Sequence, residues 1–367
     1  LRAYVELSEM CHDDRILNVE FKNKLKVKEY IRAWFVISEI ANEHFDTKKQ
    51  SLLETDDKLD VSNLLIISAD ALIALLAEKG KLAQGSAQKS IDLLTYWNMD
   101  HDVFSSPLFP TDQGNYLILS SIFLAGNPVR SIFRLLSHDE IDISFKGISS
   151  EKELERIFTR MGFRCSTGYK FYDDAGDGDI DCIAFKEDTF IICESKNIVP
   201  NESTYDRYRT TQLLTKKASQ QANRAVKYVS ANLSQISEKL SIKIASTSAV
   251  RIYPVIITNL FDFTGLVING VPVCDFSAFG KFATAKYIYR TIRGKEGITR
   301  VPVKELFKGD VPTAAELLSQ LRNPFQIEYQ AKKLMTTSIT QPMTKDLTLK
   351  VFDVRESEIT DEEFETA

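Results

Sequence analysis

The sequence lacks the features that mark a secreted, membrane-spanning or zinc-binding chain. Its five cysteines are odd in number and form no CxxC pair, which favours reduced thiols over a disulfide framework or a zinc site. The four histidines are scattered without metal-ligand spacing. The longest apolar stretch, residues 64–76, is shorter than a membrane span and is interrupted by Ser68 and Asp70. The chain begins at Leu1 without a basic-then-apolar signal segment, so we expect a truncated chain from a cytoplasmic protein with no membrane contact.

The charge balance excludes a uniformly basic nucleic-acid-binding surface. The chain has 51 acidic and 46 basic residues and a net charge of −5. The charges are unevenly spread, because residues 355–365 are acidic while residues 207–227 and 281–308 are rich in Lys and Arg. Contact with nucleic-acid phosphates needs only a local basic face, so a nucleic-acid partner stays compatible with this composition.

With 367 residues, the chain is long enough for two domains. Residues 1–145 have the apolar periodicity of a mostly helical domain. A linker is expected over residues 139–149, followed by a second domain over residues 146–300 and a C-terminal extension with an acidic tail over residues 301–367. The helices predicted in the first domain cover residues 27–45, 61–76 (capped by Asp60 or Ser62), 86–97 and 129–136.

The most informative stretch is a predicted hairpin within residues 178–196. Strands are expected over residues 180–185 and 190–196, joined by a four-residue loop that places Phe185 opposite Phe190. Counting back along the strands puts Asp181 opposite Glu194, and strand alternation puts Glu194 and Lys196 on one face. Two neighbouring carboxylates repel each other, and a hard cation such as Mg²⁺ relieves that repulsion.

These residues resemble the motif of the PD-(D/E)XK, or restriction-endonuclease-like, nuclease superfamily, in particular its Mrr-like branch. The resemblance covers residues 147–282 and consists of several ordered pieces. A helix over residues 151–161 ends at Gly162-Phe163, a Gly/Asp loop over residues 176–178 precedes Asp181, and Glu194-Ser195-Lys196 follows on the next strand. The chain departs from the motif at Ile180, where many members have proline.

The resemblance implies a mixed α/β or α+β protein with a helical N-terminal domain and a restriction-endonuclease-like αβββαβ core around a mixed central sheet. It implies that Asp181 and Glu194 bind Mg²⁺ or Mn²⁺, with the Ser195 carbonyl as a third oxygen ligand. Lys196 would orient or deprotonate the attacking water. The family's helical glutamate corresponds to Glu151, with Glu155 in reserve, and its helical glutamine corresponds to Gln221. Asp179 has two interpretations, as a second metal ligand or as a turn-capping residue.

The activity implied by the resemblance is metal-dependent hydrolysis of DNA phosphodiester bonds by an endonuclease, in the manner of a bacterial restriction or antiphage-defence effector. The partner implied is double-stranded DNA. The N-terminal domain would supply recognition, regulation, or contacts to another copy or a partner protein. Five basic residues are candidate phosphate contacts: Arg207, Arg209, Lys216, Lys217 and Arg224.

Two alternatives stay open at this stage. In the first, the chain is a catalytically silent nuclease-fold subunit that binds nucleic acid or acts as a scaffold. In the second, the fold is an unrelated α/β domain in which Glu194 and Lys196 form a surface ion pair. Whether the substrate is DNA or RNA, and single- or double-stranded, does not follow from the sequence.

Overall fold

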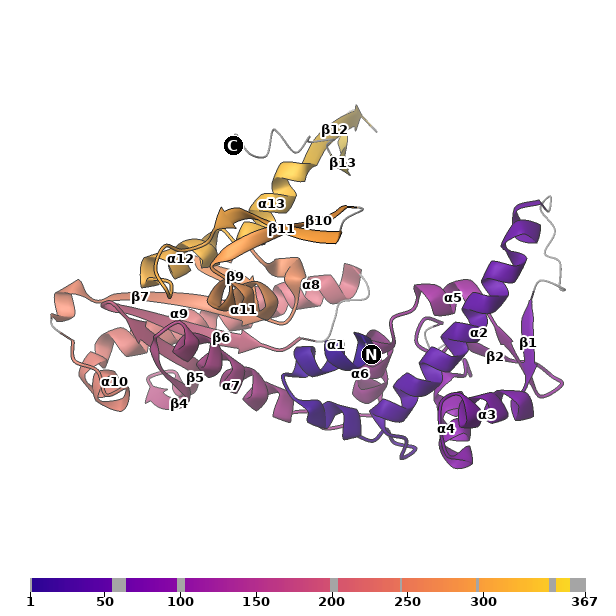
Figure 1. Ribbon diagram of the computed structural model, residues 1–367. Coiled ribbons are helices and arrows are strands. Elements are labelled where there is room, and N and C mark those ends of the chain that lie inside the picture. Colours follow the sequence, from indigo (N-terminus) through magenta and orange to yellow (C-terminus); the bar gives the residue numbers. More distant parts are fainter. Residues whose placement is uncertain are drawn as a thin grey trace. The chain divides into compact units, whose positions relative to one another are not determined.

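The computed structural model describes residues 2–54, 64–97, 103–198, 204–244, 246–294, 297–342 and 348–356. The chain divides into two compact units. The first consists of Leu1–Ser149 with Val199–Glu202, and the second consists of Ser150–Ile198 with Ser203–Ala367. Figure 1 traces their helices and strands.

The first unit is mainly helical and contains one small antiparallel sheet, in which β3 lies between β1 and β2. Its core forms around α2, where Tyr30 and Trp34 are buried and the Trp34 ring lies 5.2 Å from the Phe123 ring, centroid to centroid. Within the described residues, no helix combines the length and apolar character needed to cross a membrane. The elements are α1 (Arg2–Cys11), a 3₁₀ turn (Asp14–Asn18), α2 (Val27–Glu54), β1 (Leu65–Ser68), α3 (Ala69–Glu78), α4 (Gln84–Leu94), β2 (Leu108–Pro110), β3 (Asn115–Ile118), α5 (Ser120–Ala125) and α6 (Pro128–His138).

The helix predicted over residues 61–76 is wrong in its first part. Residues 65–68 form β1, which pairs with β3, and α3 begins only at Ala69. The β-branched pair Ile66-Ile67 suits a strand, and pairing with β3 overrides the helical periodicity. Ser68 caps α3 by accepting a hydrogen bond from the Ala71 amide at 3.3 Å. The predicted caps, Asp60 and Ser62, lie outside the described residues.

The second unit is built on a mixed six-stranded sheet in the order β4-β5-β6-β7-β9-β8. β4, β5 and β6 are antiparallel neighbours, β6, β7 and β9 are parallel, and β8 is antiparallel to β9. Its elements are α7 (Phe145–Arg160), β4 (Arg164–Asp173), β5 (Gly176–Lys186), β6 (Thr189–Lys196), α8 (Thr204–Leu213), a π-helical turn (Leu214–Ala218), α9 (Ser219–Ala231), α10 (Leu233–Lys239), β7 (Arg251–Thr258), β8 (Val267–Ile268), β9 (Val271–Asp275), α11 (Phe276–Thr284), β10 (Tyr287–Gly294), β11 (Gly297–Glu305), α12 (Ala314–Arg322), α13 (Phe325–Lys333), β12 (Leu334–Pro342) and β13 (Thr348–Glu356); short 3₁₀ turns cover Thr247–Ala249 and Phe261–Phe263.

Helices cover both faces of this sheet (Figure 1). On one face, α7, α11 and α12 pack on the sheet through buried side chains that include Phe158, Phe279 and Leu317. On the other face, α9 packs through Ala222, Ala225 and Val229. The chain therefore has a mixed α/β fold. The segment from residue 301, which we expected to be an extension, contributes α12 to the body of this unit.

The predicted β5–β6 hairpin is present, and its register is confirmed. Phe185 pairs with Phe190, and Cys182 pairs with Cys193. The loop is shorter than predicted, because Lys186 also pairs with Thr189 and only two residues remain between the strands. These two, Glu187 and Asp188, have φ angles of 51° and 56°, as a type I′ turn requires.

The linker predicted over residues 139–149 is wrong. Ile141, Ile143 and Phe145 pack against the core of the first unit, and α7 begins at Phe145. The hydroxyl of Ser149 donates a hydrogen bond to Asp13 Oδ2 at 2.8 Å. The boundary between the units therefore falls within one continuous helix, α7. Phe145, before the boundary, packs against the core of the first unit, and Leu154, after it, is buried in the core of the second.

Candidate active site

Asp181 lies where the ladder between β5 and β6 stops. The last paired residues are Cys182 and Cys193. Beyond them, the Asp181 carboxylate, and not a backbone carbonyl of β5, accepts the next hydrogen bond from β6. Its Oδ2 atom accepts a hydrogen bond from the Ser195 amide at 2.6 Å. Burial raises the pKa of Asp181, while the Ser195 N–H and the charge of Lys196 oppose that shift. This bond to a neighbouring backbone fixes the carboxylate at the edge of the site.

Glu194 and Lys196 lie on the same face of β6, as strand alternation predicts. The Glu194 side chain is buried, with only 3% of the residue exposed, and Lys196 Nζ donates a hydrogen bond to its Oε1 atom. Burial raises the pKa of Glu194 to about 7, the charge of Asp181 adds to the shift, and Lys196 opposes it. The alternative of a surface ion pair is therefore wrong, because this pair is mostly buried.

Glu151 reaches the same cluster from α7. Burial raises its pKa to about 6, and the charges of Asp181 and Asp179 add to that shift, which places Glu151 within electrostatic reach of these two aspartates. The predicted reserve, Glu155, is exposed. Glu151 thus joins the cluster, although it lies thirty residues before Asp181 in the chain.

A glycine that we did not predict makes room for Glu151. The register of β4 and β5 pairs Thr167 with Cys182 and Tyr169 with Ile180, so Gly168 lies opposite Asp181. Gly168 has a φ of +61°, and a Cβ atom built on it would lie 3.4 Å from Glu151 Oε2. A side chain at this position would be strained by the positive φ, and its Cβ would be in van der Waals contact with the carboxylate. A lone glycine within a strand was the available signal, since it often marks the close approach of another group.

A hydrogen bond between two residues that we did not predict connects α7 to the end of β6. The hydroxyl of Ser150, which is buried, accepts a hydrogen bond from Asn197 Nδ2 at 3.0 Å. Ser150 immediately precedes Glu151, and Asn197 immediately follows Lys196. This bond therefore links the backbone segments that carry two of the site residues.

Two buried polar atoms near the cluster have no hydrogen-bond partner among the described residues. They are Gln221 Oε1 and Ser195 Oγ. Gln221 lies on α9 beside Ala222, which packs in the same cluster as Ile256, and Ile256 is paired with Glu194 across β6 and β7. An unpartnered buried acceptor costs about 1–3 kcal/mol, so a bound group or water that donates to Gln221 Oε1 would stabilise this arrangement. The predicted role of Gln221 stays a prediction.

Asp181, Glu194 and Glu151 carry the oxygen ligands that a divalent cation prefers. All three carboxylates have raised pKa values, and the charge of Asp181 contributes to the shift of both glutamates, so a bound cation would relieve repulsion among these acids. Ser195, the predicted source of a carbonyl ligand, follows Glu194 on β6, and its amide donates a hydrogen bond to Asp181. Among the described residues, no group of three or more His, Cys, Asp or Glu side chains is arranged so that it could hold a metal ion. Asp179 is exposed and acts on the cluster through its charge.

The five candidate phosphate contacts are not equivalent. Arg207, Arg209, Lys216 and Lys217 are exposed, in α8 and the π-helical turn after it. Arg207 lies 3.4 Å from Asp262, and the Arg209 guanidinium lies over the Tyr205 ring. All four stay predicted phosphate contacts.

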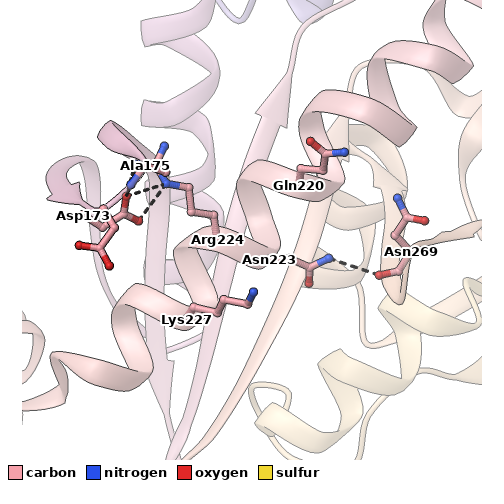
Figure 2. A pocket seen from close by; sticks show the side chains of 8 residues that line it. Asp173, Ala175, Gln220, Asn223, Arg224, Lys227 and Asn269 are labelled. Carbon is pink, nitrogen blue, oxygen red and sulfur yellow. Dashed lines mark hydrogen bonds and ion pairs between the residues drawn. The ribbon is translucent and has the colours of Figure 1, made fainter.

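Arg224, the fifth candidate, is used inside the fold. Its guanidinium donates to Asp173 at 2.6 Å and to the carbonyls of Gly176 and Asp177 at 2.5 and 3.1 Å. Figure 2 shows Arg224 reaching from α9 to the β4–β5 turn, at one side of a pocket of about 690 Å³. Arg224 therefore holds the turn that leads into the strand carrying Asp181, and its role as a phosphate contact stays a prediction.

Comparison with known proteins adds no relative to this picture. No family model matches the sequence, and a search of curated proteins finds no match. The functional interpretation therefore depends on the side chains of this site.

Proposed function

We propose that the protein is a metal-dependent nuclease that hydrolyses phosphodiester bonds, with a restriction-endonuclease-like core in its second unit. The observation that carries this proposal is the placement of Asp181 and Glu194 beside Lys196 on neighbouring strands, with Glu151 within electrostatic reach of Asp181. Neighbouring buried carboxylates do not stabilise a fold, whereas a cation site needs them. The element order from α7 to β7 supports the same assignment, because a helix, three antiparallel strands, a helical segment and a parallel strand follow one another.

Each residue has a distinct task in this proposal. Asp181 and Glu194 hold the cation, Glu151 acts on it through water, and the Ser195 amide keeps Asp181 in place. Lys196, whose ammonium donates a hydrogen bond to Glu194, would orient the attacking water; it could accept a proton from that water only after losing its own proton to solvent. Bound Mg²⁺ or Mn²⁺ would lower the pKa of that water and neutralise charge on the phosphate.

The burial of the acids favours a nuclease over a silent nucleic-acid-binding subunit. Glu194 is 3% exposed and its pKa is raised to about 7. The ionised form of this side chain therefore lowers the stability of the metal-free protein. A subunit that only binds nucleic acid has no use for this arrangement, and a neutral residue there would make it more stable. DNA as the substrate, and a role in restriction or antiphage defence, belong to the same proposal and depend on the resemblance of the motif.

The first experiment compares Asp181→Asn with Asp188→Asn in a cleavage assay. Supercoiled plasmid, linear duplex and single-stranded DNA are incubated with the full chain in Mg²⁺, Mn²⁺ or EDTA. We expect wild-type cleavage with either metal and none in EDTA. Asp181→Asn should lower the rate roughly 100-fold or more, because it removes a charged ligand from the cation.

Asp188→Asn is the matched control. It makes the same chemical change at the other end of β6, in the two-residue turn, where asparagine tolerates the positive φ of 56°. It should keep wild-type activity. Binding of Mg²⁺ is measured in parallel by calorimetry. Metal binding with no cleavage of any nucleic acid would favour the silent subunit, and full activity of Asp181→Asn would remove the assignment.

A further inference from the structure

A two-stranded ribbon projects from the second unit without joining its main sheet. β10 and β11 pair only with each other, from Tyr287–Glu305 at the base to Gly294–Gly297 at the far end (Figure 1, orange). Strands of 8 and 9 residues correspond to a ribbon about 25 Å long. Residues 297–303 are all exposed, so side chains on both faces of β11 meet solvent. An isolated hairpin of this kind is only marginally stable in water, which indicates a partner.

The base of the ribbon is anchored by its own ion pairs. Lys304 contacts Glu328 of α13 at 2.6 Å. Glu305 lies 3.5 Å from Lys286, and it accepts a hydrogen bond from the Tyr287 hydroxyl at 3.3 Å. Glu305 is the acidic residue of the described ribbon, and these contacts occupy it at the base.

The remainder of the ribbon is basic. Residues 286–305 contain six basic and two acidic residues, a net charge of +4 in a chain whose total is −5. Beyond the base, the described residues include Arg290, Arg293 and Arg300 and no acid. Arg290 and Arg293 lie opposite Val301 and Ile298, and Arg300 lies opposite Thr291. The three arginines are therefore spread along the ribbon, and their charge favours a polyanion.

Apolar side chains alternate with these charges. Tyr289 is 51% exposed and Ile298 is 67% exposed, and Ile292, Val301 and Val303 are also exposed. Apolar groups contact thymine methyl groups and sugar edges, while arginine binds phosphates or guanine in a bidentate manner. A ribbon that carries both apolar side chains and arginines can therefore contact the base edges and sugars of a DNA groove as well as its phosphates.

We propose that the β10–β11 ribbon is a DNA-binding arm that enters the major groove of a B-form duplex. That groove is about 12 Å wide and admits a two-stranded ribbon, whereas the major groove of duplex RNA is too narrow. The choice of DNA rests on the proposed nuclease function. The binding surface itself does not, because it lies on elements that contribute no residue to the metal cluster.

The test is DNA binding by the full chain in EDTA, where no cleavage is expected. Fluorescence anisotropy with a 25-base-pair duplex compares the wild type with a variant that combines Arg290→Gln, Arg293→Gln and Arg300→Gln. Each lost phosphate contact lowers the slope of log K against log salt by about 0.9, so three contacts should lower it by about 2–3. Affinity for the duplex should fall at least about tenfold at low salt.

Two control variants separate this effect from misfolding and from general charge. Replacing the same three arginines by lysine keeps the charge and should keep most of the salt slope. Arg251→Gln removes an exposed arginine at the start of β7, beside Thr189 and therefore at the other end of the main sheet from Lys196, and should leave binding unchanged. A glutamine variant with wild-type affinity and slope would overturn the proposal, as would equal affinity for duplex RNA.

A second copy of the chain is the competing occupant. Sedimentation of the wild type and of Ile298→Ser distinguishes it: a dimer lost on substitution, with DNA binding unchanged, would assign the ribbon to self-association and overturn the proposal. Failure of the nuclease proposal would give a different result from failure of the ribbon proposal. In that case no metal supports cleavage, while DNA binding in EDTA still depends on the three arginines.

Discussion

The carboxylates of the cluster differ in how the surrounding protein holds them. Asp181 accepts a backbone N–H at 2.6 Å and is fixed before any ligand binds. Glu194 depends on Lys196 for its charge balance and is otherwise surrounded by protein. Glu151 owes its position to a helix and to the absence of a side chain at Gly168. We therefore expect neutralising substitutions at the three acids to change the stability of the protein by different amounts.

Glu194→Gln should stabilise the metal-free protein at high pH. The pKa of Glu194 is raised from 4.5 to about 7 in the folded state, so the protonated acid stabilises the fold below pH 4.5 and this contribution is lost as the pH rises to about 7. Glutamine keeps the shape without the charge. In EDTA at pH 8, we expect its free energy of unfolding to exceed that of the wild type by about 2 kcal/mol, since loss of the Lys196 partner offsets part of the gain.

The measurement is urea unfolding of the wild type and of Glu194→Gln at pH 5 and pH 8. The difference in their free energies of unfolding should be much smaller at pH 5 than at pH 8. Glu155→Gln, which changes an exposed carboxylate on α7, is the control and should alter neither value. A Glu194→Gln protein less stable than the wild type at pH 8 would show that the ion pair with Lys196 outweighs the cost of burial.

At the scale of elements, α9 connects the site to the β4–β5 turn. Its inner side packs on the sheet through Ala222 and Ala225, and Arg224 extends from it to Asp173. The amide of Ala175 also donates to Asp173 at 2.9 Å, so one carboxylate organises both the turn and its attachment to α9. The π-helical turn at Leu214–Ala218 directly precedes this helix, and its Leu214 and Ala218 side chains are buried.

Arg224→Lys should loosen the β4–β5 turn as Arg224→Ala does. Lysine keeps the charge but lacks the planar fork that reaches Asp173 and two carbonyls together. Hydrogen exchange of the amides at residues 174–178 should be faster in both variants, and kcat should fall with little change in the salt dependence of DNA binding. Rescue of both properties by lysine would instead assign Arg224 to phosphate contact, as we first predicted.

At the scale of the molecule, the two units have separate cores. Phe123 is buried in the first and Phe279 in the second, and each belongs to its own cluster of apolar side chains. α7 contains the boundary between them, with Phe145 packed against one core and Leu154 buried in the other. Separate cores favour separate unfolding transitions, because each core can lose its packing while the other remains folded.

Calorimetry should therefore show two transitions. Phe123→Ala should lower one and Phe279→Ala the other, each by roughly 10 °C, since emptying a buried aromatic site costs about 3–5 kcal/mol. The wild type provides the reference for both. A single transition that either substitution shifts as a whole would show that α7 couples the units into one cooperative body.

The sequence by itself determined the local geometry of the β5–β6 hairpin. The short connection between the two strands set the pairing of Phe185 with Phe190, and the period of two along a strand placed Glu194 and Lys196 on one face. These relations involve residues close together in the chain, for which periodicity is sufficient.

Only the tertiary structure decided which distant groups meet this hairpin. It placed Glu151 near Asp181 across Gly168, directed Arg224 to Asp173, and turned residues 65–68 into a strand by pairing them with β3. It also left the β10–β11 ribbon exposed outside the main sheet. Each of these outcomes depends on packing between segments far apart in sequence, and the periodicity of a single segment carries no information about its neighbour in space.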